Sequence, residues 1–232
     1  MRPVIFTCLS GFFLLLCNGL TVAQPAQKSK PQVRYDYLLH VPNSYGKSQK
    51  AYPLIIYLHG GSHRGNDLTK LKQYGPPHAL IKGRQINALI ASPQCPEGKY
   101  WSTENWFDSL YAELTQTYRI DPKRIYLTGV SMGGYGTWQT AVAYPTTFAA
   151  IAPLCGGCDD STQICQIKNV PVWAFHGTAD DVIPIDESAR LVRRLAACRG
   201  NVRFSKLANK GHDILYVYEK KAIYRWLLKH RR

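Results

Sequence analysis

Apolar residues follow two different spacings along the first half of the chain. Over 33–41 every second residue is apolar, which predicts an antiparallel edge strand with one face on the core. Residues 53–58 form a continuous apolar run that ends in His59-Gly60-Gly61. Strands covered on both faces need such uninterrupted runs, so this segment predicts a strand inside a parallel sheet.

The same order of strand and helix repeats along the rest of the chain. Further strands are expected at 88–91, 124–127, 149–154, 170–175 and 202–207. Helices are expected at 106–118, 134–144, 186–197 and 215–229. This alternation predicts an α/β fold with a mostly parallel sheet that is covered on both faces, in a single domain over 33–232. The connections between these elements are short and leave room for only a minimal lid.

The N-terminal residues have the layout of a secretory signal peptide. Arg2 precedes an apolar stretch over 4–16, and Thr21-Val22-Ala23 places small residues before a cleavage site after Ala23. The alternative is an uncleaved anchor, although the apolar stretch is short for a membrane span. We therefore expect residues 1–23 to be a signal peptide, residues 24–32 to be a disordered leader, and the mature protein to be secreted or periplasmic, without a stable membrane anchor.

Five cysteines follow the predicted cleavage site: Cys95, Cys155, Cys158, Cys165 and Cys198. Cysteines of exported proteins tend to pair, and a disulfide between Cys158 and Cys165 would close the short polar loop 159–164. The competing interpretation is a metal site built from Cys155, Cys158 and Cys165. Because exported thiols oxidise and no fourth ligand lies close in sequence, we expect the disulfide and no metal.

Basic residues outnumber acidic ones by 29 to 15, which gives a formal net charge of +14. Such a surface attracts polyanions, for example acidic polysaccharide, lipopolysaccharide or nucleic acid. The basic residues are scattered, however, apart from a cluster at 220–232. No nucleic-acid-binding module accompanies them. A solvated surface is the favoured interpretation, and no nucleic-acid partner is expected.

The clearest chemical signal is the sequence Gly129-Val130-Ser131-Met132-Gly133, which matches G-x-S-x-G. It lies between a predicted strand and a predicted helix, which is the context that a nucleophilic serine requires. A strand that turns directly into a helix brings backbone close to backbone, and glycines permit that approach. Ser131 is therefore the predicted nucleophile.

A nucleophilic serine needs a base and an acid that orients the base. Both are expected after later strands, in the order acid and then histidine. Asp180 follows the strand predicted at 170–175 and is the expected acid, with its neighbour Asp181 as the alternative. His212, between Gly211 and the last predicted helix, is the expected base.

The loop after the 53–58 strand is expected to help bind the oxyanion of the reaction. The backbone N–H groups of Gly61 and Met132 would provide the two donors, and glycine allows close approach of the substrate. His59 and His63 are four residues apart, but Gly60 and Gly61 between them argue against a helix that would bring them together on a metal. We therefore expect no metal and no cofactor.

Taken together, these segments resemble exported bacterial α/β-hydrolase esterases related to polyhydroxybutyrate depolymerases and feruloyl esterases, often labelled "predicted peptidases". The segments that carry the resemblance are 58–61, 64–67, 92–96, 100–102, 121–138, 155–157, 176–180 and 211–213. The resemblance implies an α/β-hydrolase fold and places the catalytic triad at Ser131, Asp180 and His212, with the oxyanion hole at Gly61 and Met132.

Two departures from the family pattern concern the rim of the expected site. His63 stands where relatives commonly have an acidic residue, and the loop between Cys158 and Cys165 is particular to this chain. His63 and Trp101 are the candidate substrate contacts. For Trp106, on the apolar face of a predicted helix, ordinary packing is the favoured interpretation.

The expected reaction is hydrolysis of a carboxylic ester through an acyl-enzyme on Ser131, with short-chain or polymer-displayed acyl esters as substrates. Three alternatives remain. The first is a serine peptidase that acts on short peptides, and the second is a non-catalytic binding protein on a hydrolase scaffold. The third is an esterase for acidic polysaccharide, which only the net charge favours. The sequence leaves the oligomeric state open.

Overall fold

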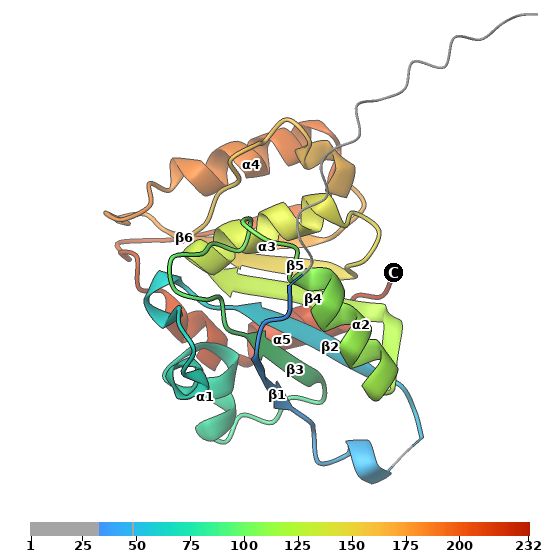
Figure 1. Ribbon diagram of the computed structural model, residues 1–232. Helices are drawn as coiled ribbons and strands as arrows, with labels where there is room; N and C mark the ends of the chain where they lie inside the picture. The colour runs from blue at the N-terminus through green and yellow to red at the C-terminus, as the bar shows by residue number, and fades with distance from the viewer. Residues whose placement is uncertain (1–32, 48) are drawn as a thin grey trace, which may run out of the picture.

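The computed structural model describes residues 33–47 and 49–232, so the predicted signal peptide and leader lie outside the described residues. Within these residues, seven strands form one sheet in the order β1-β3-β2-β4-β5-β6-β7 (Figure 1). The strands are β1 (Tyr37–His40), β2 (Tyr52–Leu58), β3 (Leu89–Pro93), β4 (Ile120–Val130), β5 (Ala150–Leu154), β6 (Val172–Gly177) and β7 (Val202–Leu207). Only β1 pairs antiparallel with its neighbour, β3, so the predicted α/β fold with an antiparallel edge strand is confirmed.

The described part of the chain forms five α-helices, which lie on the two faces of this sheet (Figure 1). They are α1 (Gly75–Ile81), α2 (Phe107–Thr117), α3 (Met132–Ala143), α4 (Asp186–Ala197) and α5 (Lys221–Lys229). Leu54, Ile56 and Leu58 of β2 belong to the core that α2, α3 and α4 cover, whereas Ile55 and Tyr57 belong to the core on the side of α5. Alternate residues of one strand thus supply two cores, which explains the continuous apolar run.

Two helical segments differ from the sequence prediction. α1 was not predicted. Gly75 has φ +73°, and the two prolines that follow it occupy the first turn of the helix, where a missing N–H costs nothing. The helix predicted at 215–229 is divided into a 3-10 helix (Leu215–Glu219) and α5. Lys220 between them has an extended backbone, with φ −87° and ψ 135°.

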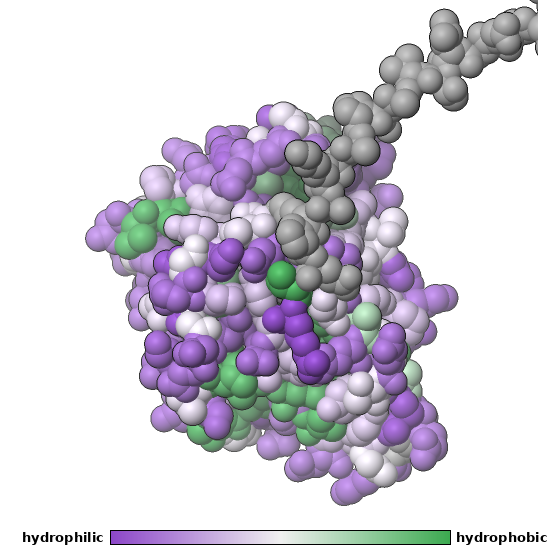
Figure 2. All heavy atoms as spheres, in the orientation of Figure 1, coloured by the Kyte–Doolittle hydropathy of each residue, from purple (hydrophilic) through white to green (hydrophobic). Residues whose placement is uncertain are grey.

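Apolar side chains are concentrated inside the molecule. On the face drawn in Figure 2 hydrophilic residues predominate, and hydrophobic ones form separate patches. Among the described residues, the exposed large hydrophobic side chains are Val41, Ile81, Tyr100 and Val182. None of the helices within residues 33–47 and 49–232 has the length and apolarity that crossing a membrane requires.

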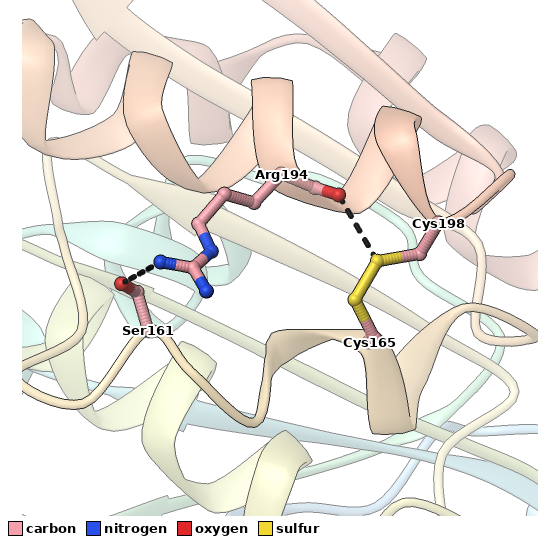
Figure 3. The surroundings of a disulfide bond; sticks show 4 residues. All are labelled: Ser161, Cys165, Arg194 and Cys198. Atoms are coloured by element: carbon pink, nitrogen blue, oxygen red, sulfur yellow. Dashed lines mark hydrogen bonds between the residues drawn. A yellow bond between two sulfur atoms is a disulfide. The ribbon is translucent and has the colours of Figure 1, made fainter.

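The disulfide expected between Cys158 and Cys165 is wrong. Cys165 is bonded to Cys198 instead, across 33 residues of sequence and with Cα atoms 5.7 Å apart (Figure 3). Cys165 lies in a 3-10 helix (Ile164–Ile167), which packs beside the C-terminal end of α4, where Cys198 follows the last helical residue. Cys158 is a buried free thiol that donates to the carbonyl oxygen of Asp160 at 3.1 Å. Cys158 is the cysteine nearest to Cys165 in sequence, but the packing of the 3-10 helix against α4 brings Cys198 to Cys165 instead. Because Cys165 is bonded to Cys198, it is unavailable for the alternative metal site.

Candidate active site

Ser131 lies at the turn between the end of β4 and the start of α3, at the carboxyl end of the sheet. Its backbone has φ 58° and ψ −119°, a conformation that residues other than glycine rarely adopt. The turn depends on its glycines, because a Cβ on Gly133 would collide with the carbonyl oxygen of Leu58, and one on Gly129 would collide with that of Gly133. The close backbone packing holds the Ser131 side chain out at the tip of the turn.

His212 is brought to Ser131 by the loop that follows β7. Its Nε2 lies 2.9 Å from the Ser131 Oγ, although the two residues are 81 positions apart in sequence. The loop passes directly over the end of β6, where a Cβ on Gly177 would collide with the carbonyl oxygen of Lys210. The His212 side chain keeps about a quarter of its surface, 24%, exposed to solvent. The imidazole can therefore exchange protons both with Ser131 and with a molecule that enters from outside.

Asp180 rather than Asp181 contacts His212. The Asp180 Oδ2 lies 2.9 Å from the His212 Nδ1, and the Asp180 carboxylate is fully buried. Its Oδ1 accepts the backbone N–H groups of Val182 at 3.0 Å and Ile183 at 2.9 Å. Burial by itself raises the pKa of Asp180, but the hydrogen bonds from Ile183, His212 and Val182 outweigh it and leave the pKa below its ordinary value. Asp181 is exposed to solvent.

The two expected oxyanion donors come from the start of α3 and from the loop after β2. Met132 is the first residue of α3, where a backbone N–H has no partner within the helix. Gly61 begins a short 3-10 helix (Gly61–His63) in the loop after β2. This loop packs against the turn at Ser131, because a Cβ on Gly60 would lie 3.5 Å from the Cβ of Ser131. Met132 thus directly follows Ser131 in the chain, and Gly61 directly follows the glycine that approaches the Ser131 side chain.

Buried hydrogen bonds hold the loop after β2 in place. The ring of His59 accepts the N–H of Cys95 on Nε2 at 3.0 Å and donates from Nδ1 to the carbonyl of Gly60 at 2.7 Å. The indole N–H of Trp101 donates to the carbonyl of His59 at 3.1 Å. Burial lowers the pKa of His59 to about 4, so its ring is neutral at pH 7. His59 and Trp101 therefore position the segment that contains Gly61.

The two candidate substrate contacts have different surroundings. Trp101 is nearly completely buried, packs against Gly136 of α3 and still borders the cavity at Ser131. His63 is buried away from that cavity, with its ring 3.8 Å from the ring of Tyr74 and its Nδ1 3.0 Å from the hydroxyl of Ser62. Burial lowers the pKa of His63. The structure thus brings Trp101, but not His63, to the site.

A cavity of about 520 Å³ opens directly beside Ser131. The residues that line it are Tyr100, Trp101, Ser102, Ser131, Met132, Tyr135, Gln139, Asp159 and Ile183. Tyr135 and Gln139 lie one and two turns beyond Ser131 on α3, so their four-residue spacing was a signal that the sequence contained. Burial raises the pKa of Tyr135 to about 12, which keeps its hydroxyl protonated. No local pattern indicated Asp159 or Ile183, which reach the cavity from separate loops.

Fold and site together define an α/β hydrolase, and comparison with known proteins identifies the family. The phospholipase/carboxylesterase family matches residues 102–229. This is more than half of the chain, which therefore belongs to that family. The chain is 26% identical over 172 residues to a probable feruloyl esterase C of Aspergillus flavus (71% of this chain, 62% of the relative), so it spans less than two thirds of that protein.

Two further relatives agree with this assignment. A poly(3-hydroxyalkanoate) depolymerase C of Paucimonas lemoignei is 38% identical over 115 residues, which cover 50% of this chain and 23% of the relative. Among solved structures, a thermostable esterase superposes with a TM-score of 0.73 and 32% identity, over 84% of this chain and 59% of that one. The resemblance to feruloyl esterases and polyhydroxyalkanoate depolymerases is confirmed.

Proposed function

We propose that the protein is a serine hydrolase of carboxylic esters in which Ser131 is the nucleophile, His212 the base and Asp180 the acid that orients it. The observation that carries the proposal is one continuous series of hydrogen bonds. It runs from the Ser131 Oγ to the His212 Nε2 at 2.9 Å, and from the His212 Nδ1 to the Asp180 Oδ2 at 2.9 Å. The series ends at a cavity large enough for a small acyl group and part of an alcohol.

In the first half of the reaction, His212 takes the Ser131 proton on Nε2 while the Ser131 Oγ bonds to the carbonyl carbon. The carbonyl electron pair moves onto its oxygen, and the N–H groups of Gly61 and Met132 bind the resulting oxyanion. The intermediate then collapses, the alcohol leaves with the proton from His212, and the acyl group stays on Ser131. In the second half water repeats these steps, and the carboxylic acid is released.

Asp180 acts on this cycle through His212 alone. Its carboxylate accepts the Nδ1 proton, which keeps Nε2 free to receive the proton of Ser131. It also stabilises the positive charge that His212 carries between the two proton transfers. The lowered pKa of Asp180 ensures that the carboxylate is ionised at the pH where His212 works.

The proposed substrates are short-chain acyl esters or acyl esters displayed on a polymer. The connection that carries Asp180, residues 178–185 between β6 and α4, is short, and Tyr100 at the rim of the cavity is 56% exposed. A site without a large cover can receive an ester that remains attached to a bulky chain. The names of the relatives, feruloyl esterase and poly(3-hydroxyalkanoate) depolymerase, support the same substrate class.

The proposed location is outside the cytoplasm. It rests on the signal-peptide pattern of residues 1–23, and the disulfide between Cys165 and Cys198 supports it. Disulfides persist in oxidising compartments and are rare in the cytosol.

The test of this function compares the protein without residues 1–23 with its Ser131→Ala variant. We expect the former to hydrolyse p-nitrophenyl acetate or butyrate and to react with a fluorophosphonate probe, and the variant to lose both properties. Ser109→Ala, at a half-buried position of α2 that does not line the cavity, is the matched control and should retain both. Undiminished hydrolysis by Ser131→Ala would exclude Ser131 as the nucleophile. Faster cleavage of an amide than of an ester with the same leaving group would favour the peptidase alternative.

A further inference from the structure

A second histidine contacts the carboxylate of Asp180. His176 is the second-last residue of β6, directly before Gly177, and its side chain is completely buried. Its Nε2 is 3.1 Å from the Asp180 Oδ2 and 2.9 Å from the carbonyl oxygen of Ile183. Its Nδ1 is 2.8 Å from the hydroxyl of Ser188 on α4. No sequence motif and no step of the proposed reaction assigns a role to His176.

The surroundings of the His176 Nε2 require a proton on that nitrogen. Both of its neighbours are acceptors, because a backbone carbonyl has no hydrogen and the carboxylate of Asp180 is ionised at neutral pH. A bare Nε2 would face two lone pairs inside the protein, where unmatched polar groups are costly. The Nε2–H therefore donates to Asp180 and Ile183.

The surroundings of the His176 Nδ1 require a second proton. The Ser188 hydroxyl has a single hydrogen and lies 2.7 Å from the carbonyl oxygen of Gly156, which can only accept. If Ser188 donates there, the 2.8 Å contact with His176 is a hydrogen bond only when Nδ1 is the donor. A neutral His176 would leave one of these two short, buried contacts without a hydrogen.

The hydrogen-bond partners of His59, in contrast, require only one ring proton. It also lies at a strand end before a glycine and is buried to 1% exposure. Its Nε2 accepts the N–H of Cys95, and its Nδ1 faces the carbonyl of Gly60, so a single ring proton satisfies both nitrogens. The two histidines differ in the partners that the fold provides.

We propose that His176 is a positioning residue that carries both ring protons and holds Asp180 as its ion-pair partner. The carboxylate then has four fixed donors, namely His176, His212 and the N–H groups of Val182 and Ile183. Its rotation is prevented, and Oδ2 stays aimed at the His212 Nδ1. The positive charge of His176 also offsets part of the carboxylate's electrostatic field at His212.

This inference deepens the proposed function and rests on it for the catalytic consequence. The titratable groups around His176 come from four elements. They are Asp180 on the loop after β6, Cys155 after β5, Glu187 next to Ser188 on α4, and Lys206, its exposed register partner on β7. Burial raises the pKa of Cys155, so this thiol carries no charge at neutral pH. Asp180 is thus the anion in direct contact with His176.

The direct test needs no enzymatic activity and separates this inference from the proposed function. Long-range proton–nitrogen NMR of the 15N-labelled protein at pH 7 distinguishes protonated from bare ring nitrogens, and His176→Gln assigns the signal by its loss. We expect two protonated nitrogens for His176 and one protonated and one bare nitrogen for His59, the internal control. A bare nitrogen on His176 overturns the proposal, whatever the enzyme hydrolyses.

The kinetic test uses the pH dependence of ester hydrolysis. His176→Gln keeps a neutral donor near Asp180, and we expect kcat to fall roughly tenfold to a hundredfold. The midpoint of the acidic limb should rise by roughly one pH unit, because the full carboxylate charge then acts on His212. A variant that merely packs less well loses rate without this displacement, and an unmoved midpoint contradicts the ion pair. If His176→Gln does not fold, Ser188→Ala, which removes the acceptor of the Nδ1 proton, should move the midpoint in the same direction.

Discussion

Replacing Asp180 by asparagine tests the central geometry with almost no change in volume. The Asp180 Oδ1 accepts two backbone N–H groups, those of Val182 and Ile183, so the single oxygen of an asparagine will occupy that position. Its NH₂ group must then lie where Oδ2 now lies, 2.9 Å from the His212 Nδ1. Two donors cannot face each other, so the Nδ1 loses its hydrogen and the Nε2 gains it. The same NH₂ group also opposes the His176 Nε2–H, 3.1 Å from the present Oδ2, which keeps the carbonyl oxygen of Ile183 as its acceptor.

This change of tautomer determines the size of the effect. A protonated Nε2 in neutral His212 cannot accept the proton of Ser131, although both side chains keep their positions. The corresponding exchange in a serine protease lowers turnover about 10⁴-fold. That factor is equivalent to roughly 5.5 kcal/mol of transition-state stabilisation. We expect a loss of kcat of this order for Asp180→Asn.

The assay is initial-rate hydrolysis of p-nitrophenyl butyrate at pH 7, with thermal unfolding measured in parallel. Asp181→Asn is the matched control, because Asp181 is the exposed neighbour and the alternative acid; its rate should remain within about twofold of wild type. A loss of less than tenfold for a folded Asp180→Asn protein would refute the reasoning. So would a loss in Asp181→Asn as large as that in Asp180→Asn.

Two further predictions concern the backbone turn and the pH dependence of stability. Gly133→Ala should lower the free energy of unfolding by about 3 kcal/mol or more, because its Cβ would collide with the backbone of Leu58. The control Gly46→Ala has open space around the new Cβ and should change the free energy of unfolding little. Equal thermal unfolding temperatures of the two variants would contradict the turn geometry. The folded chain holds the pKa of His59 at about 4, below its ordinary value of 6.5, so the unfolded chain binds the proton first as the pH falls. Stability is therefore full above about pH 6.5 and should decline by about 3 kcal/mol between that pH and pH 4. Urea unfolding at both pH values should show a smaller decline in His59→Gln, and an equal decline in both proteins would show that His59 is not the cause.

Much of the fold was predictable because it depends on patterns within single segments. Period-two and continuous apolar runs identified the edge strand and the buried strands, since each reports how many faces of a strand are covered. The strand-to-helix turn at Gly129–Gly133 was predictable for the same reason, because close backbone packing admits only glycine at its flanks. The order acid then histidine narrowed the partners of Ser131 to Asp180 or Asp181 and His212.

Only the tertiary structure determined which atoms from distant segments contact each other. Asp180 differs from Asp181 in that its carboxylate is buried against two N–H groups, and Cys165 reaches Cys198 because a 3-10 helix packs on the end of α4. His63, expected at the site, is turned away from the cavity toward Tyr74. His59 and His176 look alike in sequence, each before a glycine, yet meet different partners. Periodicity encodes which face of a segment is buried, whereas hydrogen-bond partners from distant segments depend on how the loops pack over the sheet.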